Sequence, residues 1–223
     1  YSPLGSIVKP SYNANDLIFT KRQQHCSTGP PDGCYRILSY NVLADKYTKS
    51  EEPEHPFFPY CDSAALSVNT RYPLLLKELK GYLADLLFLQ EVDQSIYVTY
   101  LKNYLEALGY DSIYAGKGVN GKALEGCVTA YKRAKFEYMK HDRALLSQFA
   151  LNGNNGDIIQ LLEQNEADRT LFLSRTNVNL VVVLRERSTK GILVTANTHI
   201  YFKPENANIK VLQAVPGEGS GGR

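Results

Sequence analysis

Short apolar runs along the chain alternate with segments in which apolar residues have helical spacing. Residues 35–40 are rich in aromatic and branched side chains, which is typical of a strand. A helix is predicted next, with Asn69 or Thr70 as its N-cap and Gly81 as its C-cap. Pro73 suits the first turn of this helix, where its missing N–H is not needed. The apolar face of the helix, spaced i, i+3, i+4 and i+7, consists of Tyr72, Leu75, Leu76 and Leu79.

The middle of the chain continues the alternation. The apolar run 85–90 predicts a strand buried on both faces. A second helix is predicted over residues 95–108, with Gly109 at its end. Its expected apolar face consists of Ile96, Tyr100, Tyr104 and Leu108. Further predicted elements are strands over 110–115, 126–132 and 136–140 and a helix over 157–166.

Two later apolar runs, 178–184 and 192–196, are joined by the short polar segment 185–191. A crossover between parallel strands needs about a dozen residues or more, so the short link predicts an antiparallel hairpin. Because strands and helices are mixed, with both hairpin and crossover links, the pattern predicts a layered α/β fold with mixed sheets.

Composition divides the chain into three parts. Residues 1–34 are rich in Ser, Pro, Gly and Asn and end in a Gly-Pro-Pro-Asp-Gly run, which predicts a leading segment or linker. Residues 48–64 contain three prolines and several charges, which predicts a surface loop. The glycine-rich residues 215–223 predict a flexible tail. The folded domain is therefore expected over residues 35–214.

The overall composition limits the classes of protein that the chain can represent. Hydrophobic residues make up 43% and charged residues 22%, which predicts a packed core rather than disorder. A net charge of +2 argues neither for nor against a nucleic-acid partner. No stretch approaches the ~20 apolar residues that a membrane span requires. Because the chain begins with Tyr1, we expect its true N-terminus, and any targeting segment there, to be missing.

The four cysteines are scattered: Cys26, Cys34, Cys61 and Cys127. They form no Cys-x-x-Cys pair and no secreted disulfide framework, so we interpret them as reduced thiols of an intracellular protein. The alternative is a metal site that uses His25, Cys26 and Cys34, but the sequence offers it no clear fourth ligand.

Polar side chains follow three of the apolar runs. Asn41 follows the first strand, Glu91 follows the second, and Asn197 and His199 follow the last. Ligand sites in layered α/β folds lie where strand ends meet loops. A carboxylate there can hold Mg²⁺, an amide can orient a phosphate, and a histidine can stabilise charge on a phosphoryl group. Taken singly, each residue more often has a structural role: an Asn in a turn, a Glu at a solvated strand end, or a His that packs in the fold.

Six motifs in order resemble the endonuclease/exonuclease/phosphatase superfamily, in its deadenylase-like branch. The resemblance covers roughly residues 35–214, and its closest likeness is the 2′-phosphodiesterase group that degrades 2′,5′-linked oligoadenylate and trims poly(A) tails in mitochondria. The group with the next greatest likeness is the cytoplasmic deadenylases. The matching segments are Ser-Tyr-Asn-Val-Leu-Ala-Asp-Lys-Tyr (39–47), Pro-Tyr-Cys (59–61), Arg71 with Lys-Glu-Leu (77–79), Ala-Asp (84–85) with Leu-Gln-Glu-Val-Asp (89–93), 125–136, and Asn-Thr-His-Ile-Tyr-Phe-Lys-Pro (197–204).

The resemblance implies a DNase I-like two-sheet sandwich flanked by helices, and Mg²⁺-dependent hydrolysis of phosphodiesters in RNA or oligoadenylate. It implies that Glu91 is the Mg²⁺ ligand and that Asn41 contacts the scissile phosphate or the water around the metal. It also implies that His199 holds the phosphate and that Pro204 lies beside the terminal adenine. It implies no membrane partner, leaves protein partners open, and favours the mitochondrial matrix, with the cytoplasm as the alternative. Lys132, Arg133 and Lys135 could attract RNA or form a solvated basic turn.

The chain also departs from the family. The later Gly-Asp-Phe-Asn and Ser-Asp-His motifs do not occur, so we expect a truncated sandwich that lacks its C-terminal half and is inactive. Such a half should expose an apolar face and open strand edges. The alternative is a noncatalytic chain that acts as a binding or regulatory protein. Different superfamily chemistry, such as that of inositol phosphatases or apurinic endonucleases, is disfavoured by the residues at 43–45 and 59–61.

Overall fold

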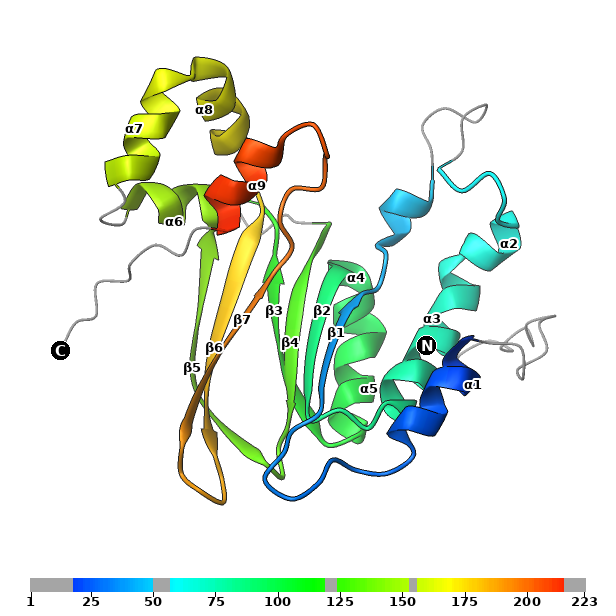
Figure 1. Ribbon diagram of the computed structural model, residues 1–223. Coiled ribbons are helices and arrows are strands. Elements are labelled where there is room, and N and C mark those ends of the chain that lie inside the picture. The colour runs from blue at the N-terminus through cyan, green and yellow to red at the C-terminus, as the bar shows by residue number, and fades with distance from the viewer. Residues whose placement is uncertain (1–17, 50–56, 119–123, 153–155, 215–223) are drawn as a thin grey trace.

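The structure, a computed structural model, describes residues 18–49, 57–118, 124–152 and 156–214. In these residues two sheets, with strand orders β1-β2-β4-β3 and β5-β6-β7, pack face to face (Figure 1). The strands are β1 (Ile37–Asn41), β2 (Leu86–Asp93), β3 (Tyr110–Gly116), β4 (Glu125–Lys132), β5 (Phe136–Leu145), β6 (Val178–Glu186) and β7 (Ile192–Thr198). The layered α/β fold that the sequence pattern predicts is confirmed, as is the two-sheet sandwich flanked by helices that the family resemblance implies. The strand expected over 136–140 is longer than predicted and continues to Leu145.

Strand directions follow the lengths of the connections. β1 and β2 are parallel and are joined through the helix α3 (Val68–Gly81), whereas β6 and β7 form the predicted antiparallel hairpin. The parallel pairing aligns Asn41 with Gln90, so the carboxyl ends of β1 and β2 lie at the same edge of the sheet. This edge carries the polar residues that the sequence singles out.

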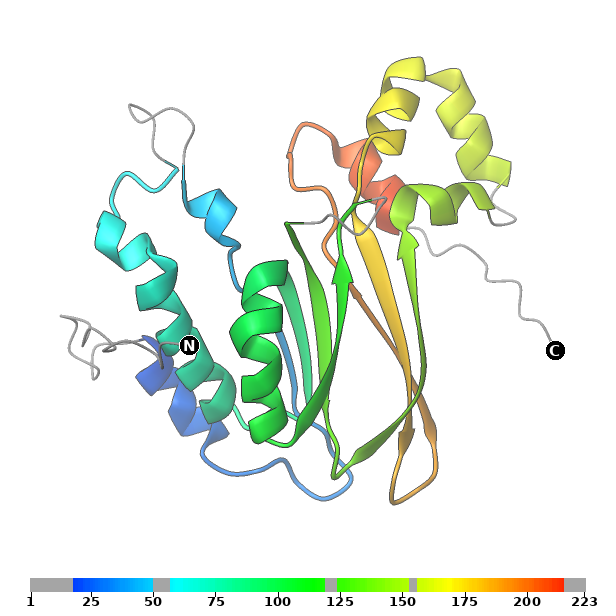
Figure 2. The same ribbon diagram turned by 180° about the vertical axis from the view of Figure 1, so that it is seen from behind.

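Helices cover the outer face of the first sheet (Figures 1 and 2). The helix predicted from position 69 or 70 is α3, but its N-cap is Ser67, and the left-handed residue beyond its end is Leu83 (φ 52°). The three residues predicted as caps, Asn69, Thr70 and Gly81, therefore lie inside the helix, and Pro73 lies beyond its first turn. The segment predicted over 95–108 is divided into α4 (Gln94–Ile96), the π-helical turn η3 (Tyr97–Leu101) and α5 (Lys102–Ala107), and Gly109 ends it with φ 85°.

The apolar face predicted for this segment is confirmed in part, because Ile96 and Leu108 pack against the core. The buried residues are Tyr97, Leu101 and Leu105, whereas Tyr100, which was expected on the apolar face, is 48% exposed. A π turn closes its hydrogen bonds at i→i+5 and so rotates the residues that follow it relative to a regular α-helix. The buried residues keep the four-residue spacing of the predicted face but lie one position further along the chain.

A second group of helices caps the end of the second sheet: α6 (Leu146–Asn152), α7 (Gly156–Gln164), α8 (Glu166–Leu173) and α9 (Ala207–Ala214) (Figure 1). We call it the helical unit. It has its own core of buried residues, centred on Phe172, which is completely buried. The other buried members are Ile158, Leu162, Tyr201, Ile209 and Leu212. Only α7 was predicted from the sequence.

Shorter elements lie in segments for which no helix was predicted. They are α1 (Ile18–Gln23), η1 (Gln24–Cys26), η2 (Asp45–Thr48) and α2 (Ser63–Leu66). The expected glycine-rich tail falls outside the described residues. Within the described part of the chain, no helix is both long and apolar enough to cross a membrane.

The outer face of the second sheet carries exposed apolar side chains. Ile192 and Val194, both on the edge strand β7, are 55% and 64% exposed. None of the described helices covers this face (Figures 1 and 2). β1, the other edge strand on this side of the molecule, exposes Ile37.

The four cysteines are free and differ in reactivity. Burial raises the pKa of the Cys127 thiol to about 12, whereas Cys34 and Cys61 are exposed. Since the thiolate is the reactive species, a disulfide reagent at pH 8 should modify Cys34 and Cys61 rapidly and Cys127 only after unfolding. Mass spectrometry of peptides after timed labelling checks this. Rapid labelling of Cys127 in the folded protein would contradict its placement between the sheets.

Candidate functional site

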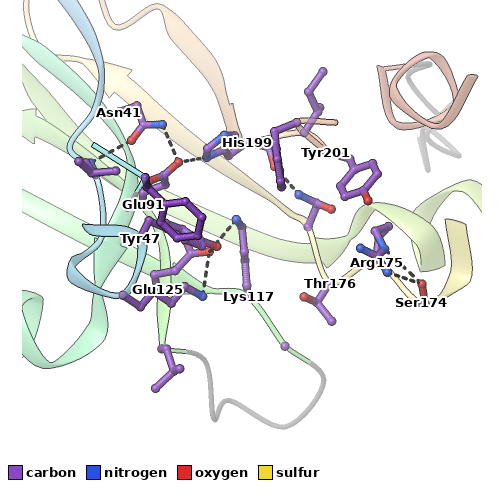
Figure 3. A pocket seen from close by; sticks show the side chains of 18 of the residues that line it. Asn41, Tyr47, Glu91, Lys117, Glu125, Ser174, Arg175, Thr176, His199 and Tyr201 are labelled. Carbon is purple, nitrogen blue, oxygen red and sulfur yellow. Dashed lines mark hydrogen bonds and ion pairs between the residues drawn. The ribbon is translucent and has the colours of Figure 1, made fainter. Parts of the chain in front are cut away.

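The ends of β1, β2 and β7 bring Asn41, Glu91 and His199 together (Figure 3). Asn41 Nδ2 donates a hydrogen bond of 2.7 Å to Glu91 Oε1, and His199 Nδ1 lies 3.7 Å from the same oxygen. The other carboxylate oxygen of Glu91 accepts the backbone N–H of Ala44 at 3.3 Å. Asn41 and His199, which are 158 positions apart in the sequence, thus face the same carboxylate oxygen of Glu91.

A bulge in β2 places Glu91. Leu89 and Val92 both pack into the core under the helices although they are three residues apart, whereas a regular strand requires an even separation. The extra residue is absorbed where the pairing of β2 with β4 shifts, between Leu89 and Val92. Glu91 there has φ 55°, a left-handed conformation that is strained for a residue with a Cβ atom. Such strain is found where function requires a particular side-chain direction.

This strain predicts a difference between two variants that both lack the carboxylate. Glycine tolerates φ 55° freely, whereas a side chain in the left-handed region costs about 1–2 kcal/mol. The greater freedom of glycine in the unfolded chain offsets about 0.4–1 kcal/mol of this gain. We therefore expect Glu91→Gly to be more stable than Glu91→Ala by roughly 0.5–1 kcal/mol in urea unfolding. Equal stability of the two variants would show that the backbone at Glu91 relaxes in solution.

Asn197 fills the gap that the bulge leaves in the ladder between β2 and β4. Asn197 is only 2% exposed. Its Nδ2 donates hydrogen bonds to the carbonyls of Leu89 (3.2 Å) and Val128 (2.9 Å). Its Oδ1 accepts a hydrogen bond of 2.8 Å from Gln90 Nε2. The sequence placed Asn197 among the candidate ligands, but in the structure it joins the two sheets behind Glu91.

A cavity of about 790 Å³ extends from these residues toward the helical unit (Figure 3). One end is lined by Asn41, Glu91 and His199, and the far end by Ser174, Arg175, Thr176, Asn177 and Tyr201. Pro204, which was expected beside a bound adenine, is exposed in the turn before α9 and does not line this cavity.

A buried carboxylate that the sequence did not single out as a site residue orients two lysines in the cavity wall. The side chain of Glu125 is fully buried, and its Oε1 lies 2.7 Å from Lys117 Nζ and 3.7 Å from Lys46 Nζ. The hydroxyl of Tyr47 donates a hydrogen bond of 3.1 Å to the same oxygen. Burial raises the pKa of Tyr47, and the negative charge of Glu125 raises it further. The two lysines line the cavity, so the cluster keeps positive charge near Glu91 and His199.

Removal of the Glu125 charge should destabilise the fold. Breaking a buried ion pair costs about 3–5 kcal/mol when the remaining charge stays buried. Lys117 and Lys46 have 17% and 37% of their side chains exposed, so both can turn toward water. For Glu125→Gln we therefore expect a smaller loss, about 2 kcal/mol, in urea unfolding. Glu137→Gln, which removes a carboxylate paired with Arg185 at the surface, is the control and should cost under about 0.5 kcal/mol.

The surroundings of His199 disfavour the charged form of its ring. Its Nδ1 is buried and has no hydrogen-bond partner among the described residues. Burial, followed by the charge of Lys117, lowers the pKa of His199 below its ordinary 6.5, while Glu91 and Glu125 act in the opposite direction. A neutral imidazole beside lysines can bind a phosphoryl oxygen without adding a permanent charge.

The donor atoms at the first end of the cavity fit Mg²⁺. Glu91 supplies hard carboxylate oxygens, and Asn41 fixes the carboxylate by a direct hydrogen bond. Among the described residues no three His, Cys, Asp or Glu side chains are close enough to enclose a metal. Mg²⁺ is commonly bound by one or two carboxylates, with water and substrate phosphate as its other ligands, whereas structural Zn²⁺ and Ca²⁺ sites need fuller protein cages.

Comparisons with known proteins give sequence relatives over nearly the whole chain. No family model matches. The 2′,5′-phosphodiesterase 12 of Rattus norvegicus is 33% identical over 213 residues, which cover 94% of this chain and 34% of the rat protein. The CCR4-Not complex 3′-5′-exoribonuclease subunit Ccr4 of Schizosaccharomyces pombe is 29% identical over 92% of this chain and 27% of its own length. The chain thus spans about a third of the length of the curated relatives it matches.

Solved structures share the fold. The crystal structure of ANGEL2, described as a 2′,3′-cyclic phosphatase in complex with adenosine-2′,3′-vanadate, superposes with a TM-score of 0.63 and 28% identity. The match covers 80% of this chain and 45% of the ANGEL2 chain. The human nocturnin catalytic domain, at 19% identity and a TM-score of 0.53, supports the same fold over 76% of this chain and 51% of its own.

Proposed function

Because the chain belongs to the endonuclease/exonuclease/phosphatase superfamily, we propose that Asn41, Glu91 and His199 form the Mg²⁺- and phosphate-binding side of a phosphodiesterase site. The observation that carries the proposal is the shared carboxylate. Glu91 Oε1 is contacted by Asn41 at 2.7 Å and faces His199 at 3.7 Å, at one end of a cavity lined with lysines.

Each residue of the site would have a separate role. Glu91 would hold Mg²⁺, which when bound neutralises negative charge that develops on the phosphoryl oxygens. Asn41 accepts the N–H of Leu43 through Oδ1 and donates through Nδ2 to Glu91, so its amide is fixed and keeps the carboxylate oriented. His199 would donate a hydrogen bond to a phosphoryl oxygen, and Lys117 and Lys46 would attract the phosphate to the cavity.

The substrate that we propose is the adenylate end of an RNA or an oligoadenylate. Support comes from the activities named for the relatives, a 2′,5′-phosphodiesterase and a 3′-5′-exoribonuclease. The cavity does not distinguish 2′,5′ from 3′,5′ linkages. The proposed place of Pro204 beside the terminal adenine requires that a bound nucleotide extend beyond the cavity to the turn before α9.

Calorimetry with Mg²⁺ and adenosine 5′-monophosphate tests the proposal. The chain should bind the nucleotide in the presence of Mg²⁺, bind it at least about 10-fold more weakly in EDTA, and bind adenosine weakly in both buffers. Equal affinity for adenosine and its monophosphate would contradict a phosphate site at His199. Nucleotide binding that is indifferent to EDTA would contradict the metal site at Glu91.

Hydrolysis assays separate the candidate reactions. Triadenylates with 2′,5′ and 3′,5′ linkages, and one ending in a 2′,3′-cyclic phosphate, are incubated with Mg²⁺ and resolved by chromatography. The cyclic substrate is included because of the likeness to ANGEL2, described as a 2′,3′-cyclic phosphatase. We expect this chain to bind but not cleave, because the Gly-Asp-Phe-Asn and Ser-Asp-His motifs of the family do not occur in its sequence. Turnover of any of the three would contradict the expected inactivity and identify the reaction.

A further inference from the structure

The segment that carries His199 leaves the sheet without strand partners. β7 ends at Thr198, whose pairing with Asn179 is the last in the hairpin. Residues 199–203 form neither strand nor helix. The β ladder therefore does not fix His199, and other contacts must hold its backbone.

Two buried amide side chains supply those contacts. Asn177 Nδ2 donates a hydrogen bond of 2.7 Å to the carbonyl of His199, and Gln213 Oε1 accepts the N–H of Tyr201 at 2.7 Å. The two amides are also joined to each other, because Gln213 Nε2 donates to Asn177 Oδ1 at 3.1 Å. Asn177 is 8% exposed and Gln213 is 5% exposed, so water does not compete freely for these bonds.

Both amides belong to the side of the molecule formed by the helical unit. Gln213 lies in the last turn of α9, and Asn177 lies between α8 and β6, with its own carbonyl accepting the N–H of Leu146 in α6 (2.9 Å). Tyr201, two residues after His199, contributes its ring to the core of the helical unit. The guanidinium of Arg175 lies 4.8 Å from the centre of that ring. The segment 199–201 is thus tied to the helical unit at both ends.

We propose that Asn177 and Gln213 are positioning residues that set the place of the His199 ring opposite Glu91. The inference rests on the proposed function for the task of His199, but the positioning itself does not depend on turnover. A buried amide that loses its partner costs about 1–3 kcal/mol, so the linked pair has one favourable arrangement. That arrangement holds the His199 carbonyl and, through it, the direction of the side chain toward the 3.7 Å contact with Glu91.

NMR of the complete chain with labelled histidine tests the positioning at a fixed pH of about 7.5. The chain has four histidines, and the signal of His199 is assigned by its loss in His199→Gln. Asn177→Leu and Gln213→Met remove the hydrogen bonds at nearly constant volume. In both variants we expect the ring signal of His199 to shift and broaden, with the other three histidine signals unchanged. The Mg²⁺-dependent affinity for adenosine 5′-monophosphate should fall about 10-fold, as for outer-shell partners of metal sites.

A conservative variant and a matched control make the test specific. Gln213→Glu keeps an acceptor for the N–H of Tyr201 but cannot donate to Asn177, so its shift should be smaller than that of Gln213→Met. Asn208→Leu removes an exposed amide from the same helix, where it contacts Asp168, and should leave the His199 signal in place. If Asn177→Leu does not fold, the His199 signals of Gln213→Glu, Gln213→Met and Asn208→Leu are compared with one another to test the proposal.

An unchanged His199 signal in Gln213→Met, combined with lower stability, would overturn the proposal and leave the amide pair a purely structural role. Failure of the proposed function has a different outcome. The wild-type chain would then not bind the nucleotide in a Mg²⁺-dependent way, while the His199 signal would still respond to Asn177→Leu.

Discussion

Replacing Glu91 with glutamine should lower the affinity of the chain for Mg²⁺ by more than about 100-fold, because loss of an outer-shell partner alone costs 10–100-fold. Glutamine keeps the size of the side chain but removes the negative charge that a hard divalent cation requires. The neighbouring amide of Asn41 is not expected to compensate, because its Nδ2 is directed at Glu91 Oε1 (2.7 Å) and its Oδ1 accepts the N–H of Leu43. Calorimetric titration with Mg²⁺ measures the loss.

The control for this prediction is a carboxylate far from the cavity. Glu137→Gln, on the outer face of β5, should bind Mg²⁺ as the wild type does. Asp93 and Asp45 lie near the same edge of the sheet, where the backbone N–H of Asp45 donates to Asp93 at 2.9 Å. Wild-type affinity in Glu91→Gln, together with a loss in Asp93→Asn, would mean that the cation binds at this second pair instead.

The second large effect is expected from Asn197→Ala, which should destabilise the fold by about 3 kcal/mol. The substitution leaves the carbonyls of Leu89 and Val128 buried without the donor that now satisfies them, at about 1–3 kcal/mol for each group. It also removes the acceptor of Gln90 Nε2, although that group can turn toward water because Gln90 is only half-buried. Urea unfolding followed by circular dichroism gives the free energy.

Thr195→Val is the matched control on the same strand. Thr195 is also buried and faces inward, but its hydroxyl makes a single hydrogen bond, to the carbonyl of Val182 (3.0 Å). Its replacement should cost about 1 kcal/mol and leave Mg²⁺ binding unchanged. Asn197→Ala should in addition weaken Mg²⁺ binding, because the bulge that presents Glu91 loses its support. A cost for Asn197→Ala no greater than that of Thr195→Val would contradict the role assigned to Asn197.

The sheets were predictable because their signals are local. The apolar run of β2 and the short polar link between β6 and β7 each specify an element without reference to the rest of the chain. The helical unit was predictable only in part. Its helices are 7 to 9 residues long, too short to be stable alone, and they depend on a shared core around Phe172. Contacts of this kind leave no periodic pattern in such short segments.

The candidate site also contains residues that the sequence indicates and residues that only the fold reveals. Asn41 ends β1 and His199 directly follows β7, where the sequence marks them, whereas Glu91, predicted to follow its strand, lies inside β2 two residues before its end. Glu125, Asn177 and Gln213 act through buried polar contacts between segments far apart in the sequence, as in the hydrogen bonds of Glu125 with Tyr47 and of Gln213 with Asn177. Such residues are recognised only when the fold brings their partners together. Glu125 stands in a segment that resembles the family, but this resemblance does not reveal its ion pairs.

Selective broadening by Mn²⁺ tests most directly whether Asn41, Glu91 and His199 form one metal and phosphate site. Mn²⁺ takes the same oxygen ligands as Mg²⁺ and broadens NMR signals of nearby nuclei. At substoichiometric Mn²⁺ the ring signal of His199 should disappear before that of His141, which is exposed on β5, and excess Mg²⁺ should restore it. Glu91→Gln should abolish the effect. Broadening that begins at His141, or that persists in Glu91→Gln, would contradict a shared site.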